Sequence, residues 1–331
     1  MPGIDFNKLF QSFAQIKVGV IGDLMLDTYW WGKVDRISPE APVPVVAVTN
    51  REQRIGGAGN VALNVQALGA TVHTISVLGN DLDGEQLTAL LNSNNINTAY
   101  LVKSADRITT NKIRIISRNQ HMMRLDAEIT RPLAEVEEVQ LIASFESYIK
   151  KEKPQVVILE DYNKGVLTPA VIEKVIACCK ENNILTAVDP KRKNFFTYRM
   201  VDIFKPNLHE AKEGLNIISD AVSNELLSTI HSSLYEKLQH HISFITLSEK
   251  GVFIQSEKES AIIPTHIRSI ADVSGAGDTV IAVAAVVYAA TRDMRLMAEI
   301  SNIAGGLVCE EVGTVAIDKD KLLAECMLLL T

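Results

Sequence analysis

The sequence is poor in cysteine, in long apolar runs and in secretion signals. Only four of its 331 residues are cysteines, and Cys178, Cys179, Cys309 and Cys326 match neither a disulfide framework nor a C-x-x-C metal site. We therefore expect reduced thiols that serve packing. The longest apolar run, 280–290, is far shorter than the roughly 18 residues of a membrane-spanning helix. With no cleavable leader recognisable near the N-terminus, we expect a soluble, cytoplasmic protein without a membrane partner.

Positive charge is also scarce. The chain has 33 Lys and Arg against 40 Asp and Glu, a net charge of −7, and no block of basic residues. This balance argues against a nucleic-acid partner and favours a small molecule. Hydrophobic residues make up 47% of the chain, which is enough for a large core. Because no repeat, low-complexity tract or Gly/Ser linker interrupts it, we expect one domain over 1–331.

Short β-branched runs alternate with longer helical patterns along most of the chain. This alternation predicts an α/β core that is doubly wound, with a mostly parallel sheet and helices on both of its faces. The expected strands are 18–21, 71–78, 156–159, 185–188, 203–204 and 244–247, and the expected helices are 60–68, 85–91, 133–149 and 169–182.

Two segments break the alternation. The prolines in 41–48 indicate an edge strand, and 109–117 with 121–126 indicates a hairpin. Since no helices accompany them, we expect a small β-sheet, inserted at about 34–50 and 107–126, that acts as a lid over a cleft. A thin sheet cannot bury both faces against its own core, so its apolar residues predict a homodimer that pairs lid against lid.

The segment DVSGAGDT at 272–279 precedes an apolar stretch that we expect to be a buried helix. Gly275 and Gly277 flank Ala276, which allows backbone N–H groups to converge at the helix N-terminus, where an anion is stabilised. Asp278 falls in the first turn, placed to accept a proton from an attacking hydroxyl. The alternative is that Asp278 only caps the helix and the glycines only turn the chain.

Other polar residues follow expected strands. Asn207 and Glu210 are three apart, so they share a helix face, and they either hold Mg²⁺ through waters or cap the helix. The turn 246–251 suits a nucleotide at the carboxyl edge of the sheet. Asp23 and Asp27, after the first strand, either bind sugar hydroxyls or cap a loop.

Several enzyme classes are excluded by motif. The spacing Gly57-x-Gly59-x-x-Ala62 fits a dinucleotide fingerprint, but the polar segment 50–54 before it is no buried strand, so an NAD-dependent oxidoreductase is disfavoured. A G-x-x-x-x-G-K-[ST] phosphate loop is absent, which excludes a P-loop enzyme, and no second histidine completes a zinc site after His209.

In this order, GGAGN at 56–60, NxxE at 207–210 and DVSGAGDT at 272–279 resemble the motifs of the ribokinase-like (PfkB) carbohydrate kinases. The resemblance extends over nearly the whole chain. It is strongest to the branch that phosphorylates D-glycero-β-D-manno-heptose 7-phosphate for ADP-heptose synthesis. Four further stretches resemble that branch: GDLMLDTYWWGKVDRISPEAPVPVV (22–46), RNQHMMRLD (118–126), EDYNKG (160–165) and VDPK (188–191).

The resemblance implies ATP as co-substrate, Mg²⁺ as cofactor and, as in cation-activated members, K⁺. It implies Asp278 as catalytic base and the amides of Gly275, Ala276 and Gly277 as an anion hole. The implied nucleotide and Mg-phosphate contacts are Asn207, Glu210, Thr246, Ser248, Gly251, Asn302 and Lys191. The implied sugar and phosphate contacts are Asp23, Gly57, Asn60, Asp161 and Lys164. The implied monovalent-cation loop contains Asp272, Ser274, Cys309 and Gly313.

The expected hairpin also carries four cations: Lys112, Arg114, Arg118 and Arg124. Lys112 and Arg114 are two apart, so in a regular strand they share a face that could meet a substrate phosphate. The alternative is that these are solvated charges that guard a strand edge.

The implied reaction transfers the γ-phosphoryl group of ATP to the anomeric hydroxyl of the heptose 7-phosphate and gives the 1,7-bisphosphate. The chain departs from the branch in Gly59, where alanine is usual, and in Ser274, where threonine is common; neither change removes a reacting group. Because it lacks the HxGH signature of a nucleotidyltransferase domain, we expect phosphorylation without adenylylation. The alternatives are a kinase for another sugar or sugar phosphate and a sugar-binding pseudokinase.

Overall fold

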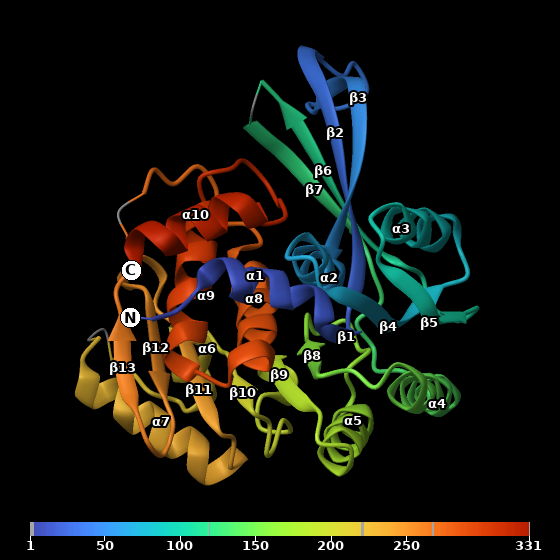
Figure 1. The fold of residues 1–331 in the computed structure, drawn as a ribbon. Helices are drawn as coiled ribbons and strands as arrows, with labels where there is room; N and C mark the ends of the chain where they lie inside the picture. Colours follow the sequence, from blue (N-terminus) through green and yellow to red (C-terminus); the bar gives the residue numbers. More distant parts are fainter. Residues whose placement is uncertain (1–2, 119, 220–221, 267, 331) are drawn as a thin grey trace.

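The structure is a computed structural model that describes residues 3–118, 120–219, 222–266 and 268–330. Within these residues the main sheet has nine strands in the order β13-β12-β11-β10-β9-β8-β1-β4-β5 (Figure 1). Pairing is parallel from β5 to β11 and antiparallel for β12 and β13. Its strands are β1 (Lys17–Gly22), β4 (Thr71–Gly79), β5 (Asn97–Ser104), β8 (Val156–Glu160), β9 (Leu185–Asp189), β10 (Ile203–Phe204), β11 (Ile242–Thr246), β12 (Val252–Gln255) and β13 (Ser260–Ile263).

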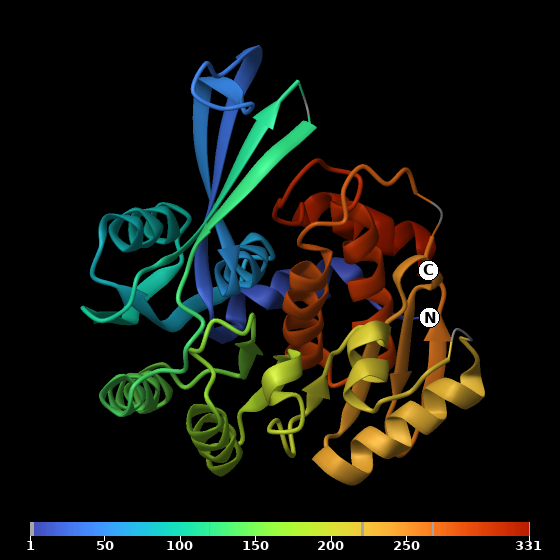
Figure 2. The same cartoon turned by 180° about the vertical axis from the view of Figure 1, so that it is seen from behind.

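Helices cover both faces of this sheet (Figures 1 and 2). One face packs against α1 (Phe6–Ser12), α2 (Ala58–Ala67), α3 (Leu82–Ser93), α8 (Ala276–Thr291), α9 (Met294–Val308) and α10 (Lys319–Leu329). The other packs against α4 (Glu135–Glu152), α5 (Pro169–Glu181), α6 (Leu208–Gly214) and α7 (Asn224–Leu238). Every residue of β8 and β9 is buried, because both of their sides face helices. The predicted α/β class is confirmed, and none of the described helices has the length and apolar character needed to cross a bilayer.

A second sheet projects from the core (Figure 1). We call it the small sheet, and in the described residues its order is β3-β2-β6-β7. Its strands are β2 (Leu24–Ile37), β3 (Pro44–Gly57), β6 (Thr110–Ser117) and β7 (Gln120–Ala127). β2 was missed in the sequence because its first six residues are buried and its last three exposed, so it shows no regular alternation.

The register of the small sheet gives it two different faces. Ile113 pairs with Leu125, and Ile115 pairs with both Met123 and Trp30. Directly paired residues share a face, so these five side chains form one apolar surface. Met123 is 56% exposed and Leu125 is 42% exposed, which leaves this surface in contact with solvent.

Candidate active site

The carboxyl ends of the parallel strands gather most of the predicted residues. Glu160 ends β8, Asp189 ends β9 and Thr246 ends β11. Asp23 alone separates β1 from β2, so the small sheet starts at the same edge. This is the edge where open α/β sheets bind ligands.

Asp278 lies in the first turn of α8 and is buried. Its Oδ2 accepts a hydrogen bond from Nδ2 of Asn60 at 2.7 Å, and its Oδ1 accepts one from the hydroxyl of Tyr162 at 2.7 Å. Burial raises the pKa of Asp278 to about 6, while the two hydrogen bonds oppose the rise. A carboxylate with a pKa so near neutrality is suited to accept a proton.

The N-terminus of α8 has the form expected of an anion site. Gly275 precedes the helix with φ +80°, and a Cβ there would lie 2.9 Å from Nδ2 of Asn60, so only glycine fits. A Cβ on Gly277 would lie 3.8 Å from both Oδ2 of Asp189 and Nζ of Lys205. An anion at the first turn of α8 would therefore meet helix N–H groups and the Lys205 ammonium together.

A cluster of buried carboxylates adjoins this anion site. Glu160, Asp189 and Asp278 each place an oxygen within 4.8 Å of the others. Lys205 pairs with Asp189 at 2.8 Å and Lys191 pairs with it at 3.2 Å. Burial would raise the pKa of Asp189, but the two ammonium groups outweigh it and hold that pKa below its usual value.

Glu160 is the exception in the cluster. Neither of its oxygens has a hydrogen-bond partner among the described residues, and burial followed by the charges of Asp189 and Asp278 raises its pKa well above the usual range. Unsatisfied carboxylate oxygens beside other carboxylates fit the oxygen preference of Mg²⁺. We did not predict Glu160, Asp189 and Lys205 as site residues. Each ends or follows a buried strand, and this position was the sequence signal that could have identified them.

Asn207 and Glu210 form the N-terminal cap of α6. Oδ1 of Asn207 accepts from the N–H of Glu210, and Oε2 of Glu210 accepts from the N–H of Asn207, both at 2.8 Å. The capping alternative is thus what the structure shows for these oxygens. The other oxygen of Glu210 lies 2.6 Å from Nζ of Lys191, which connects this pair to the carboxylate cluster.

The predicted nucleotide residues lie around one turn. Thr246 forms an isolated parallel β-bridge with Asn207. Ser248 begins a single 3₁₀ turn, and Gly251 ends that turn with φ +94°. A Cβ on Gly251 would lie 2.0 Å from the carbonyl oxygen of Ile263. Asn302 on α9 donates a hydrogen bond to the carbonyl of Pro264 at 2.9 Å. Pro264 follows the last residue of β13, beside Gly251, so Asn302 lies near the same turn.

Asp23 and Asp161, two of the predicted sugar contacts, are hydrogen-bonded to other groups of the chain in this structure. Both carboxyl-bearing residues are only 1% exposed. The oxygens of Asp23 accept the N–H groups of Tyr162, Lys164 and Val166, so Asp23 anchors the loop after β8. Asp161 accepts from the hydroxyl of Tyr198 and from a backbone N–H, and burial raises its pKa to about 6. Neither carboxylate is open to a sugar in this conformation.

The remaining predicted sugar contacts are at the start of α2 and in the loop after β8. Gly57 precedes α2 with φ +59°, and a Cβ there would lie 2.4 Å from the carbonyl oxygen of Asp23. Asn60, in the first turn of α2, uses its amide to hold Asp278. Lys164 pairs with Glu128 at 2.7 Å.

The structure separates the four hairpin cations. Nζ of Lys112 lies 5.6 Å from the ring centroid of Tyr162, while Arg114 pairs with Asp27. Arg118 is exposed in the turn between β6 and β7, and Arg124 pairs with a neighbouring aspartate on β7. Of these four cations, Lys112 therefore lies beside a residue that touches the candidate base.

The predicted cation-loop residues lie together. Asp272 accepts the N–H of Ser274 at 2.9 Å and that of Gly313 at 3.0 Å, and its own N–H donates to the carbonyl of Cys309. Burial would raise the pKa of Asp272, but these N–H groups outweigh it and keep the pKa low. The loop therefore joins the start of the motif to the segment after α9.

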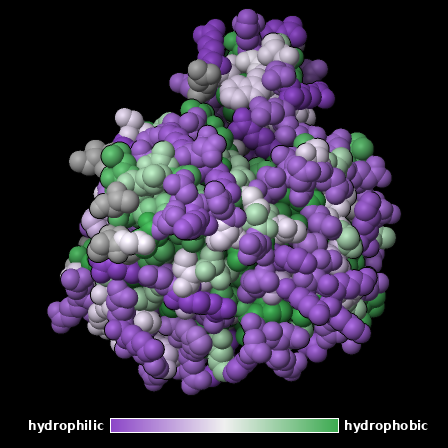
Figure 3. Space-filling model, viewed as in Figure 1, coloured by the Kyte–Doolittle hydropathy of each residue, from purple (hydrophilic) through white to green (hydrophobic). Residues whose placement is uncertain are grey.

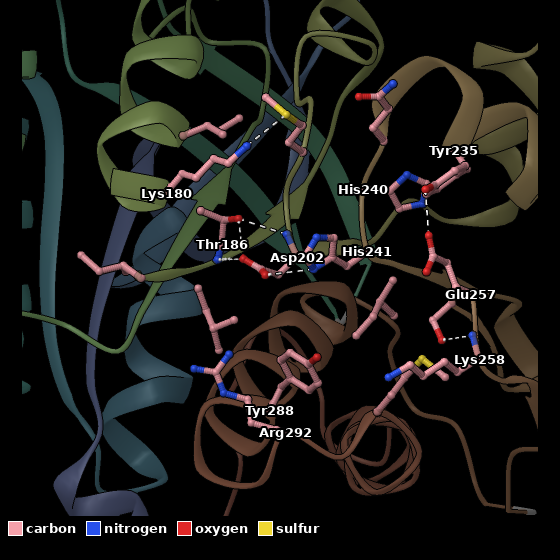
Figure 4. Close-up of a pocket in the computed structure, with 18 of the residues that line it drawn as sticks. Lys180, Thr186, Asp202, Tyr235, His240, His241, Glu257, Lys258, Tyr288 and Arg292 are labelled. Atoms are coloured by element: carbon pink, nitrogen blue, oxygen red, sulfur yellow. Dashed lines mark hydrogen bonds and ion pairs between the residues drawn. The ribbon is translucent and has the colours of Figure 1, made fainter. Parts of the chain in front are cut away.

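A groove of about 1270 Å³ lies at the opposite edge of the main sheet (Figure 4). Leu185 and Ile242, which begin β9 and β11, contribute to its wall, together with His240, His241 and Tyr288. None of the predicted site residues that the structure describes lines it. The groove is therefore separate from the candidate active site.

A buried carboxylate that can take a proton, beside a helix N-terminus and a buried ammonium on a doubly wound sheet, is an arrangement suited to a phosphotransferase. Comparison with known proteins specifies the family. The model of the pfkB family of carbohydrate kinases matches residues 15–321, and the chain belongs to this family. The predicted carbohydrate kinase is thereby confirmed.

A relative agrees with this assignment, and solved structures share the fold. The bifunctional protein HldE of Aliarcobacter butzleri is 40% identical over 306 residues, which cover 92% of this chain and 63% of that protein. This chain therefore spans less than two thirds of that relative. Phosphofructokinase-2 of Escherichia coli with substrates and products has the same fold, with a TM-score of 0.77, 17% identity and coverage of 96% and 99%. The complex of that enzyme with potassium has a TM-score of 0.76 and 17% identity, and the match covers 94% of this chain and 99% of that chain.

Proposed function

We propose that the protein transfers the γ-phosphoryl group of ATP to the anomeric hydroxyl of D-glycero-β-D-manno-heptose 7-phosphate. The product would be the 1,7-bisphosphate, a precursor in cytoplasmic ADP-heptose and lipopolysaccharide synthesis. The observation that carries the kinase chemistry is the buried Asp278 at the N-terminus of α8, with both oxygens held by donors. The heptose phosphate is supported by the four stretches that resemble this branch and by the 40% identical relative.

Asp278 is the proposed catalytic base. Its pKa of about 6 leaves the carboxylate mostly ionised at neutral pH, yet basic enough to accept the hydroxyl proton. The first-turn N–H groups of α8 and the ammonium of Lys205 would stabilise the charge that spreads over the transferred phosphoryl group. Glu160, Asp189 and Glu210 are the carboxylates placed to hold Mg²⁺, directly or through waters. When bound, Mg²⁺ neutralises phosphate charge.

The 7-phosphate has a proposed site beneath the small sheet. Burial lowers the pKa of Lys112, and the nearby charge of Lys164 lowers it further. A phosphate between these two ammonium groups would relieve both effects. Arg114 lies two residues along the same face of β6, although Asp27 neutralises it in this structure.

Two further features belong to this proposal. The loop of Asp272, Cys309 and Gly313 would hold a monovalent cation such as K⁺, as the family resemblance implies. The exposed apolar surface of the small sheet, including Met123 and Leu125, would pair with a second copy of the chain.

A substrate panel tests the proposed acceptor. Purified protein with ATP and Mg²⁺ should release ADP much faster with the heptose 7-phosphate than with the free heptose, fructose 6-phosphate or ribose. Equal kcat/KM on phosphorylated and free heptose would reject the heptose 7-phosphate and leave only a carbohydrate kinase.

A further inference from the structure

Tyr162 touches the candidate base. It lies in the stretch EDYNKG (160–165), but no role was predicted for it from the sequence. Its hydroxyl donates to Oδ1 of Asp278 at 2.7 Å, and Asn60 holds the other oxygen at the same distance. Each oxygen of the carboxylate thus has a donor of its own. Two such hydrogen bonds from different directions fix the plane of the carboxylate.

The backbone that carries Tyr162 is held on two sides. Buried Asp23 accepts the N–H groups of Tyr162, Lys164 and Val166 at 2.8, 3.0 and 3.1 Å. The guanidinium of Arg107 donates to the carbonyl of Lys164 at 2.6 Å. The backbone at Tyr162 is therefore held by buried groups of the folded core.

Two ammonium groups, from two different parts of the chain, lie near the ring of Tyr162. Nζ of Lys112, on β6 of the small sheet, lies 5.6 Å from the ring centroid, and Nζ of Lys191, in the loop after β9, lies 5.8 Å from it. Cations at these distances attract the π system and make the phenol O–H a stronger donor. Lys191 is paired with Glu210 of α6, whereas Lys112 belongs to the small sheet.

We propose that Tyr162 is a positioning residue for Asp278, and that Lys112 links this role to the small sheet. The hydroxyl of Tyr162 orients the carboxylate toward the acceptor, and Lys112 strengthens that hydrogen bond when the small sheet lies over the site. This inference deepens the proposed function and rests on Asp278 acting as the base.

Other charges also face Asp278 and must be separated from the effect of Tyr162. They come from the ends of neighbouring strands and the loops after them: Glu160, Asp189, Lys191 and Lys205. All four remain in a Tyr162→Phe variant, which removes one hydroxyl only. Because that hydroxyl lowers the pKa of Asp278, its loss should raise the pKa.

The first experiment is the pH profile of kcat/KM for Tyr162→Phe. We expect the acid limb to move upward by about one pH unit, with activity lowered about fivefold near pH 6, about tenfold below pH 5 and much less above pH 8. KM for ATP should not change. Tyr148→Phe is the matched control, because the buried hydroxyl of Tyr148 has no hydrogen-bond partner among the described residues. A Tyr162→Phe profile that coincides with the wild-type profile would overturn the proposal.

A second readout does not depend on the sugar. In ¹³C NMR of the protein without substrates, the carboxyl signal of Asp278 is assigned by its loss in Asp278→Asn. Its titration midpoint should rise in Tyr162→Phe, and an unchanged midpoint would contradict the inference. If the midpoint rises but the protein is inactive on every sugar, the proposed function is rejected and the role of Tyr162 in orienting Asp278 stands.

The link to the small sheet is tested by a double-mutant cycle. Lys112→Met should move the acid limb upward when Tyr162 is present and leave it in place in the Tyr162→Phe background. Equal movement in both backgrounds would show that Lys112 acts on Asp278 directly, and would remove the link.

Discussion

Asn60 and Asp278 are 218 residues apart in the sequence, yet Nδ2 of Asn60 lies 2.7 Å from Oδ2 of Asp278. The contact joins the first turns of α2 and α8. Both helices begin after glycines with positive φ, Gly57 and Gly275, which bring the two N-termini close together. The candidate base therefore depends on the packing of two remote segments as much as on its own motif.

The first prediction concerns turnover. Asp278→Asn should lower kcat by roughly 10²–10⁴ or more, because an amide cannot accept the hydroxyl proton. ATP affinity, measured by calorimetry, should change little. Near-normal turnover would remove Asp278 as the base.

Asp278→Asn should lower kcat but raise the stability of the folded protein. The pKa of Asp278 is about 6 in the folded protein and 3.8 as its reference value, so the folded state favours the protonated form. Its contribution to stability is full below pH 3.8 and is lost as pH rises through 6. At pH 7.5, Asp278→Asn should thus raise the free energy of unfolding by about 1–3 kcal/mol, and the gain should shrink near pH 4. Urea titrations at both pH values measure it, and a loss of stability at pH 7.5 would contradict this account.

The third prediction concerns the acceptor phosphate. Lys112→Ala should raise KM for the phosphorylated sugar about ten- to more than a hundredfold, since a charge-assisted contact is worth on the order of 1.5–3 kcal/mol. Arg124→Ala is the matched control, because Arg124 lies on exposed β7 and pairs with Asp126. Both variants should keep KM for ATP. If steady-state kinetics show the same KM in both variants, Lys112 does not bind the phosphate.

The fourth prediction concerns the cation loop. K⁺ should raise activity relative to a bulky organic cation at equal ionic strength, and Asp272→Ala should abolish the difference. Asp272 connects Ser274 and Gly313, so its loss should open the loop. Identical rates of the wild-type protein in the two salts would reject a monovalent-cation site.

The fifth prediction concerns assembly. The wild-type protein should be a dimer at micromolar concentration, and Met123→Asp should make it monomeric by placing a charge on the apolar surface of the small sheet. Ile218→Asp is the control, because Ile218 is an exposed apolar residue too but lies after α6, outside the small sheet. Light scattering that finds only monomer for the wild-type protein would rule out this pairing.

The sequence predicted the six central strands of the main sheet, β1, β4 and β8 to β11, because runs such as 156–159 are apolar throughout and lie between amphipathic helices. It missed the edge strand β5 and the antiparallel strands β12 and β13. In the small sheet it predicted β3, β6 and β7 but missed β2. The long strand β2 runs from the buried core into solvent, so its pattern changes along its length. Local periodicity cannot reveal a strand whose surroundings change in this way.

The site was predictable where glycines and a helix start mark it, as around Asp278. It was less predictable for Glu160, Asp189 and Lys205, because their side chains come together only where separate strands end side by side. Asp23 shows the reverse case: its position after β1 was correctly seen as special, but its oxygens hold a backbone loop. Residue type and position alone do not distinguish these two uses of a buried carboxylate.

In β6, Lys112 and Arg114 alternate with Ile113 and Ile115. One strand therefore encodes two surfaces, one directed at the site and the other at solvent. Inserting or deleting a single residue there would exchange the two surfaces along the rest of the strand. Single substitutions in β6 would therefore alter either the proposed acceptor contact or the proposed dimer surface, whereas a change in the length of β6 would disrupt both at once.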